Sequence, residues 1–257
     1  MRRLIAIGLL AFCASPTQAD IAFVRNHGGF GDKNTATSES VTLTGVPIVG
    51  NLLVGRIALD PAAGAVSCSD NASTPNTYTV DIDAVNGSGS SGVRTFICSA
   101  AVVNVPTTMT FSFPSEVARG SSVDEYSGTD TTSSRVDASS TTTGTGTTNV
   151  VSTVTVNTSG SIVIAAVGVE GPTSQTYTED SHIAWTTRTR KGTASGATAT
   201  NITSNGADFI TSSTGQINYH PTLGTSALWA EALVASTPAA PAAPKNVPRQ
   251  VIITQEE

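Results

Sequence analysis

Charged side chains and helix-forming residues are scarce in this chain. Only 12% of its 257 residues are Asp, Glu, Lys or Arg, about half the share that globular domains usually carry. It has 2 methionines, and no long stretch repeats its apolar residues every 3.6 positions, which argues against a helical fold. Ser, Thr, Gly and Asn fill the polar positions instead, and this composition is typical of strands joined by many turns.

Basic residues are the scarcer of the two charge types. The chain has 13 Lys and Arg against 19 Asp and Glu, a formal net charge of −6. A nucleic-acid partner requires a Lys/Arg patch that neutralises phosphates. The charge balance therefore argues against nucleic-acid binding, and the mild acidity mainly favours solubility.

Long apolar runs are missing after the first few residues, so we expect no membrane span. At the start, Arg2 and Arg3 precede an apolar stretch at 4–14, and small residues follow as far as Ala19. This pattern predicts a secretory signal peptide over residues 1–19. We expect the mature protein outside the cell or on its surface, with the periplasm as the alternative.

Cysteine is also rare, with 3 residues, one of them inside the predicted signal peptide. Two cysteines in an oxidising compartment predict a disulfide, Cys68–Cys98, rather than a redox or metal site. Cys98 shares a strand face with Phe96 and Val102, so we expect the bridge at the edge of the core. It would stabilise the fold by ~3–4 kcal/mol through the unfolded state.

Apolar and polar residues alternate in roughly a dozen segments from Asp20 onward, which is the signature of β-strands. Residues 52–59 are apolar on both faces, as in a central strand. Turn residues separate the segments at the spacing of antiparallel sandwiches and barrels. We predict an all-β fold, a single antiparallel β-sandwich of jelly-roll type, over residues 20–236.

Two stretches resemble each other, VTLTGVPIVGNLLVGRIALDP from residue 41 and VTVNTSGSIVIAAVGVEGP from residue 154, with Gly50 matching Gly160. A Tyr-Thr strand start follows each one, and each half closes on an apolar strand that contains a glutamate, Glu125 or Glu231. The similarity indicates either a duplicated sheet unit or two buried strands of like composition, and the second interpretation is the simpler.

The composition changes after Ser236, where TPAAPAAPKNVP predicts a semi-rigid linker. We predict a Pro/Ala-rich linker and flexible tail over residues 237–257. The tail ends in RQVIITQEE, which is β-prone. It is either disordered or donates a strand to a neighbour's sheet edge.

Catalytic motifs are lacking. The segment HGGF at 27–30 is similar to an esterase oxyanion-hole motif, but the G-x-S-x-G turn that such an enzyme also needs is absent. The three histidines, His27, His182 and His220, lack metal-binding spacing. We predict no catalytic, cofactor-binding or metal-ligating residues, and therefore no enzyme.

Acidic residues offer two weaker alternatives. Asp81 and Asp83 share a strand face and could bind calcium with Asp70 or Asn71, although a solvated strand face is the favoured interpretation. A glycosidase needs two carboxylates that both reach the scissile bond. Asp124 and Glu125 are adjacent and therefore point to opposite faces of a strand, while Glu116 and Asp124 flank a turn. No E-x-D-x-x-E arrangement is present, which argues against a glycosidase site.

The other conspicuous side chains have structural explanations. Arg188, Arg190 and Lys191 form a cationic stripe that we expect to face solvent. Trp185 and Trp229 lie among apolar neighbours, so we expect them in the core rather than on a sugar-binding surface.

The segments GNLLVGRIALD, SDNASTPNTYT, VRTFICSA, TTMTFSFP and DEYSGTD lie within residues 41–236. Together they resemble a β-sandwich module that recurs in secreted bacterial and phage-associated proteins. The resemblance implies a jelly-roll or concanavalin-like sandwich that accompanies surface or carbohydrate-binding proteins, with no assigned chemistry. Cys68 and Cys98 depart from the module's pattern.

These observations lead to three hypotheses. The first is a non-enzymatic extracellular module for binding or adhesion, with a glycan or a surface protein as its ligand. The second is a self-associating surface protein that donates its C-terminal strand. The third is a carbohydrate-active hydrolase that uses Glu116, Asp124 or Glu125.

Overall fold

The structure, a computed structural model, describes residues 20–89, 91–132, 134–147 and 152–241. The predicted signal peptide and most of the predicted tail lie outside these residues. The one helical segment in the described residues is a 3₁₀ turn, η1 (Thr198–Thr200). None of the helical structure described is long and apolar enough to cross a membrane.

The first half of the chain forms β1 (Ala22–Asp32), β2 (Ala36–Thr42), β3 (Leu52–Leu59), β4 (Ser67–Asp70), β5 (Thr79–Ser88), β6 (Ser91–Ala101), β7 (Thr108–Glu116) and β8 (Arg119–Ser127). The second half forms β9 (Val136–Gly146), β10 (Ser152–Val156), β11 (Ile162–Glu170), β12 (Tyr177–Thr178), β13 (Thr186–Thr187), β14 (Lys191–Gly192), β15 (Ile202–Ile210), β16 (Gly215–Tyr219), β17 (Thr222–Leu223) and β18 (Ala227–Ser236).

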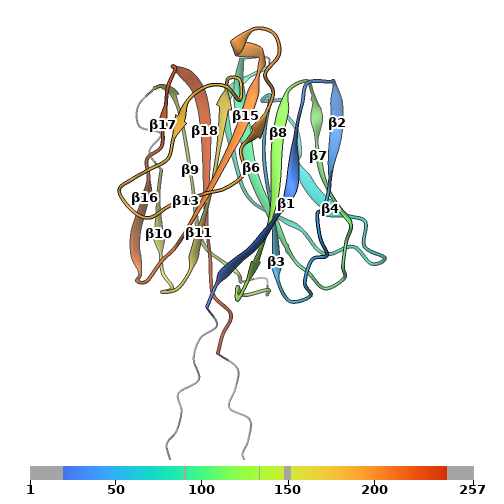
Figure 1. Cartoon of the computed structure of the whole chain (residues 1–257), viewed down its shortest axis with the longest axis vertical. Coiled ribbons are helices and arrows are strands. Elements are labelled where there is room, and N and C mark those ends of the chain that lie inside the picture. Colours follow the sequence, from blue (N-terminus) through green and yellow to red (C-terminus); the bar gives the residue numbers. More distant parts are fainter. Residues whose placement is uncertain (1–19, 90, 133, 148–151, 242–257) are drawn as a thin grey trace, which may run out of the picture.

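The strands form two large inner sheets that pack face to face, with a smaller outer sheet on the far side of each (Figure 1). The first inner sheet has the order β1-β8-β3-β6-β5, and its outer sheet is β2-β7-β4. The second inner sheet has the order β13-β15-β11-β18-β9, and its outer sheet is β10-β16. All strand pairings within the sheets are antiparallel, so the predicted all-β, antiparallel, sandwich-like fold is confirmed.

Strand β3 shows why residues 52–59 are apolar on both faces. Leu53 and Ile57 pack in the core beneath the first outer sheet. Leu52 and Val54 point the other way and pack on residues of the second inner sheet. Every residue of β3 is therefore buried, because the strand lies between two layers.

The two halves share one strand order. The order β1-β8-β3-β6 with β2-β7 in the first half corresponds to β9-β18-β11-β15 with β10-β16 in the second. Gly50 and Gly160 each lie two residues before the central strand, and both have positive φ, 92° and 79°. This equivalence supports duplication, although Glu125 pairs with Leu53 and Glu231 with Val167, so the two glutamates are not equivalent.

Strands β1 to β4 alternate between the first inner and first outer sheets, and so do β6 to β8. Such alternation is typical of a jelly roll. The finer assignment as a jelly roll stays a prediction.

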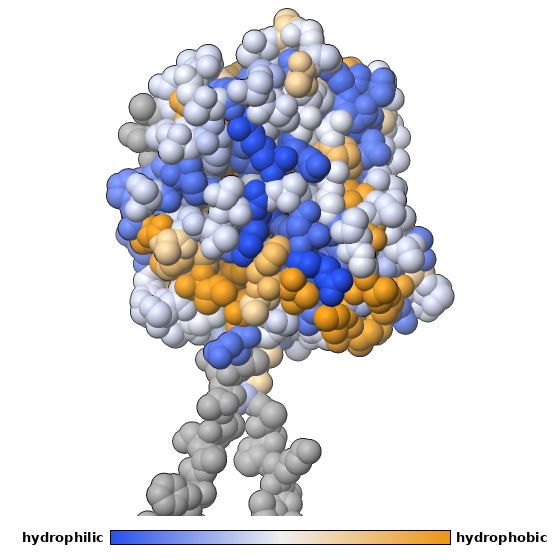
Figure 2. Space-filling view, viewed as in Figure 1, coloured by the Kyte–Doolittle hydropathy of each residue, from blue (hydrophilic) through white to orange (hydrophobic). Residues whose placement is uncertain are grey.

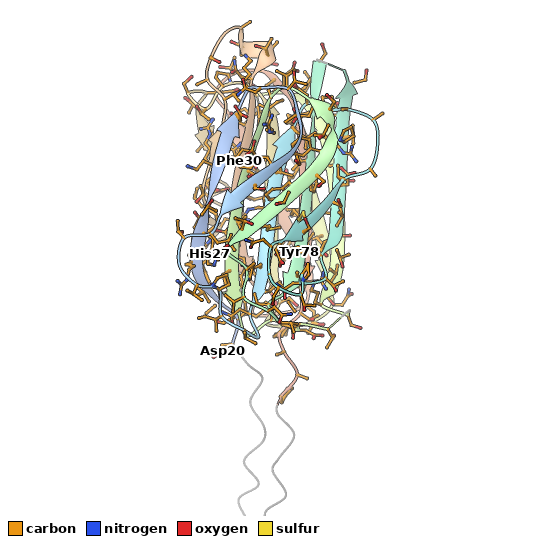
Figure 3. The ribbon with its side chains drawn as sticks, turned by 90° about the vertical axis from the view of Figure 1, so that its right-hand side faces the viewer. Asp20, His27, Phe30 and Tyr78 are labelled. Carbon is orange, nitrogen blue, oxygen red and sulfur yellow. A yellow bond between two sulfur atoms is a disulfide. The ribbon has the colours of Figure 1, made fainter. Side chains whose placement is uncertain are left out.

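Both ends of the described chain lie at the same end of the molecule, which we call the base. Strand β1 rises from Asp20 at the base past His27 to Phe30 (Figure 3). β18 ends at Ser236 near the base, where the N–H of Ala239 donates to the carbonyl of Gly128 at 2.8 Å. The opposite end, the far end, is formed by loops 32–36, 60–66, 116–119 and 192–201.

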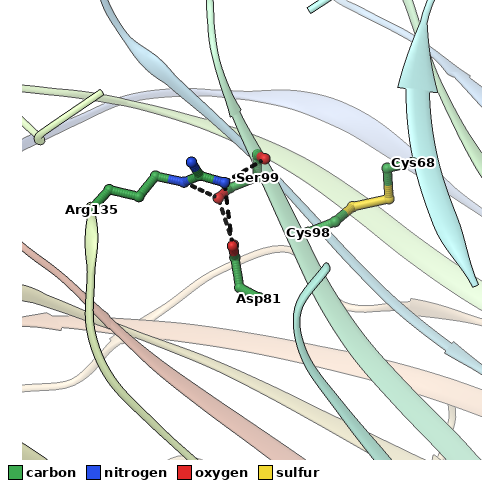
Figure 4. Close-up of a disulfide and its surroundings, with 5 residues drawn as sticks. All are labelled: Cys68, Asp81, Cys98, Ser99 and Arg135. Atoms are coloured by element: carbon green, nitrogen blue, oxygen red, sulfur yellow. Dashed lines mark hydrogen bonds and ion pairs between the residues drawn. A yellow bond between two sulfur atoms is a disulfide. The ribbon is translucent and has the colours of Figure 1, made fainter. Parts of the chain in front are cut away.

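Cys68 and Cys98 form the predicted disulfide, with their Cα atoms 6.5 Å apart (Figure 4). Cys68 belongs to the first outer sheet and Cys98 to the first inner sheet. Cys98 is fully buried and packs with Phe96 and Phe111. The bridge therefore joins two layers at the edge of a core, as the strand faces predicted.

Candidate binding site at the far end

Three cavities adjoin at the far end. The largest, about 550 Å³, lies between the two halves and is lined by 31–34 and 192–195. The second, about 200 Å³, is lined by Asp60, Ala62, Gly89, Ser115, Glu116 and Val117. The third, about 160 Å³, has Lys33, Asp60, Val117 and Thr200 in its wall and so shares lining residues with each of the other two. Figure 2 shows hydrophilic residues along the middle of the visible face, above hydrophobic residues toward the base.

Lys33 joins the two halves at this site. Its Nζ donates to the carbonyl of Ser195 at 2.5 Å and to Oγ1 of Thr200 at 2.6 Å. Both partners lie between β14 and β15, more than 160 residues further along the chain. The wall of the largest cavity is therefore formed only when the two inner sheets are packed together.

Arg119 organises the acidic residues around the site. Its Nη2 donates to Asp32 and to Glu39, each at 2.7 Å, and its Nη1 donates to the carbonyl of Asn34 at 2.6 Å. The guanidinium also lies over the ring of Phe113. Because Arg119 is buried, these charge-assisted hydrogen bonds fix the ends of β1, β2 and β8 relative to one another.

Glu116 is the buried carboxyl in this cluster that lacks a protein donor. Its side chain is 1% exposed, and neither carboxyl oxygen has a hydrogen-bond partner. Burial raises the pKa of Glu116 to about 8, an effect that Arg119 and the backbone of Asp60 oppose and that the carboxyl charges of Asp60 and Asp32 increase. The raised pKa favours the neutral acid form of this carboxyl.

Asp60 lines the same cavity as Glu116. Its Oδ2 accepts the N–H of Ala118 at 2.9 Å. Burial raises the pKa of Asp60 above its usual value, while the hydrogen bond from Ala118 lowers it. The cavity therefore has two carboxyl groups, each of which is disfavoured as a free anion.

The other two carboxylates of the hydrolase hypothesis lie elsewhere. Asp124 is buried between the inner sheets, where it pairs with Arg56 and accepts Nδ2 of Asn26 at 2.7 Å. Glu125 points to the opposite face and accepts Nε2 of His27 at 2.9 Å. Neither carboxylate lines a far-end cavity, so Glu116, Asp124 and Glu125 are not brought together.

The histidines do not form a metal site with other residues. His27 is buried between Glu125 and the carbonyl of Thr44. His182 and His220 lie with ring centroids 5.4 Å apart, and both are held by Asp180. Across the described ranges, no group of three or more His, Cys, Asp and Glu residues could hold a metal ion.

The segment HGGF belongs to β1 rather than to a catalytic loop. Gly29 pairs with Ser122 of β8, and a side chain at Gly29 would clash with the backbone of Ser121. The glycine there permits two strands to approach closely. The HGGF segment therefore has a role in strand packing.

The calcium candidates have other partners. Asp81 accepts Oγ of Ser99 at 2.5 Å and Nη2 of Arg135 at 3.3 Å, as Figure 4 shows. Asp83 pairs with Arg94, while Asp70 and Asn71 accept hydrogen bonds within the loops at the base. The structure does not gather these four residues around one point.

The prediction that the cationic stripe faces solvent is wrong. Arg188 donates to both oxygens of Asp208, at 2.5 and 2.9 Å, and stacks over Phe23 at 3.6 Å. Arg190 donates to the carbonyl of Gln175. Packing of β13 and β14 against β15 brings Arg188 beside Asp208, and all three stripe residues are partly buried. Trp185 and Trp229 are buried, as predicted.

The sequence did not single out Lys33, Asp60 or Arg119. The available signal was that charges are rare in this chain, so a charge next to a buried strand is unusual. Asp60 immediately follows the buried β3, and Arg119 opens the buried β8.

Comparisons with family models, curated proteins and solved structures find no match to this chain. The resemblance to a secreted bacterial and phage-associated β-sandwich module therefore stays a prediction.

Proposed function

We propose that this protein is an exported, non-enzymatic binding module that holds a ligand of an extracellular surface in its far-end cavities. The observation that supports this proposal most directly is their position. The three cavities open opposite the base, where both ends of the described chain leave. A module attached or continued at its base would present the far end outward.

The lining of the cavities fits recognition better than catalysis. The largest cavity is open and is lined mainly by polar side chains and glycines. Asp32 and Lys33 already have protein partners, so the site is pre-organised, which lowers the entropic cost of binding. A glycan or a protein loop could place hydroxyl or amide groups against these residues.

The test uses residues 20–257 on an array of glycans and on intact cell surfaces. Lys33→Ala should reduce the bound signal at least tenfold, because it opens the cleft wall between the halves. The matched control is Asp130→Asn, which alters a partly exposed base residue and should leave binding unchanged. Absence of binding to every glycan and cell surface would overturn the proposal.

A second candidate function, self-association through the base, is favoured by one observation. Five of the eight large hydrophobic residues exposed in the described part of the chain, Val46, Ile48, Val49, Val103 and Val105, lie on two base loops. Backbone hydrogen bonds from Leu43 to Thr107 and from Gly50 to Val102 hold these loops side by side. Such an apolar patch is typical of an interaction surface. Pro241, the last described residue, lies at the same end of the molecule.

Light scattering separates this second function from the first. If the base patch mediates assembly, Val46→Ser with Val49→Ser should convert oligomers of residues 20–257 to monomers. Val85→Ser, at an exposed valine on β5, is the matched control. A monomeric wild-type protein would remove self-association and leave the far-end proposal unaffected.

A further inference from the structure

The cavity shared by Asp60 and Glu116 combines aliphatic walls with acidic groups. Ala62, Gly89 and Val117 contribute apolar surface, and Val117 is 43% exposed. The two carboxyls are the charged groups in its lining.

The Glu116 carboxyl is buried without a hydrogen-bond donor. Buried polar groups in proteins almost always have a hydrogen-bond partner. Both oxygens of Glu116 lack one, although the side chain is almost fully buried in a wall of the cavity. Arg119 does not supply the donor, because its hydrogen bonds go to Asp32, Glu39 and backbone carbonyls.

The charges around the cavity favour a cation. Asp32, Glu39, Asp60 and Glu116 supply up to four negative charges, against two positive charges from Lys33 and Arg119. Lys33 lines the adjoining cavity and donates to Ser195 and Thr200 rather than to either cavity carboxyl. A positive group beside Glu116 would favour its ionised form.

A metal ion fits this cavity poorly. Calcium takes six to eight oxygen ligands, whereas two carboxyls line this cavity and one oxygen of Asp60 already accepts the Ala118 N–H. The aliphatic wall suits methylene groups instead, since long cationic side chains cover apolar surface with their stems. An amino sugar carries its amine directly on a polar ring and offers no such stem.

We propose that this cavity binds the side chain of a lysine presented by a surface protein, with its ammonium donating to Glu116 and Asp60. The proposal rests on the proposed function and specifies its ligand as a protein with an exposed lysine. Binding is reversible and forms no covalent bond. The proton held by Glu116 in the empty cavity passes to solvent as the ammonium arrives.

The experiment follows the Glu116 carboxyl carbon by NMR in residues 20–257 labelled with ¹³C at glutamate Cδ. The probe is Nα-acetyl-lysine methylamide. Its norleucine analogue, which has the same stem without the ammonium, and glucosamine are the comparison ligands. We expect saturating lysine probe to lower the apparent pKa of Glu116 by at least one unit, and norleucine probe to leave it unchanged.

Variants provide the second arm. Glu116→Gln replaces the neutral acid by a group of the same shape, so it should fold, and should weaken the lysine probe at least fivefold. Asp60→Asn should also weaken it, whereas Asp130→Asn should not. Equal binding of the norleucine probe, tighter binding of glucosamine, or an unshifted Glu116 would overturn the lysine assignment. Failure of the lysine assignment would leave the proposed binding function intact, provided that the protein still binds on the array and that Lys33→Ala abolishes this binding. The two failures are therefore distinguishable.

Discussion

The Oε1 atom of Glu116 lies 3.7 Å from Nη1 of Arg119, too far for a hydrogen bond, although both side chains are buried. Arg119 is oriented by Asp32 and Glu39 instead. The far end therefore contains an ion-pair cluster beside a carboxyl that the cluster does not satisfy. This imbalance makes the site sensitive to pH.

Stability should fall as Glu116 ionises. Its pKa is about 8 in the folded protein against an ordinary value of 4.5. Between these two values the folded state binds more protons than the unfolded state, so the free energy of unfolding decreases as pH rises. We expect wild-type stability, relative to Glu116→Gln, to fall by roughly 2–4 kcal/mol from pH 5 to pH 8. Urea titrations at both pH values measure it, and a difference that does not change with pH would contradict the assignment.

Loss of the disulfide should destabilise the fold without changing it. The Cys68–Cys98 bridge spans 30 residues, so Cys68→Ala with Cys98→Ala should cost about 3–4 kcal/mol. Equilibrium unfolding of the oxidised wild type and the double variant gives the difference. Reduction of the wild type should reproduce the loss, and reduction of the double variant should have no effect.

The buried ion pair between the inner sheets should tolerate loss of both charges better than loss of one. Arg56 and Asp124 are both fully buried. Asp124→Asn alone leaves Arg56 uncompensated and should cost about 3–5 kcal/mol. Arg56→Met combined with Asp124→Leu should be less destabilising than that single change. Thermal unfolding of the wild type and the two variants tests the order, and a double variant that is less stable than Asp124→Asn would argue against a coupled pair.

Close packing of the inner sheets should depend on Gly168. A methyl group placed there would meet the side chains of Thr95, Val93 and Ala58 across the sheet interface. We expect Gly168→Ala to destabilise the protein by about 1–3 kcal/mol, because the sheets must separate to accept it. Ser139→Ala, on the exposed surface of the edge strand β9, is the control and should change stability little. An unaffected Gly168→Ala melting temperature would show that the interface can adjust.

Local patterns were sufficient to predict the elements. Alternation predicts strands because successive side chains of a strand point to opposite faces. The two-faced apolar runs that became β3 and β11 identified central strands, and Cys98 was placed on a buried face by its neighbours. Both tryptophans were recognised as core residues for the same reason.

The way in which the two halves of the chain pack together could not be predicted from these local sequence patterns. A run that is apolar on both faces shows that two layers cover it, but not which layers. The matched strand orders became visible only from the sheets. Likewise, the sequence pattern predicts that Arg188 is exposed, yet its side chain lies over Phe23 of the other half and pairs with Asp208 of its own half.

The sequence by itself determined an antiparallel all-β chain with one cross-link, since strand periodicity and cysteine number are local properties. The tertiary structure alone decided the far-end site. Lys33, Asp60, Glu116 and Arg119 come from the ends of four strands, and Lys33 meets partners more than 160 residues away. The environment of a single charged residue leaves no periodic trace in sequence. It is set by which strand ends meet when the sheets pack.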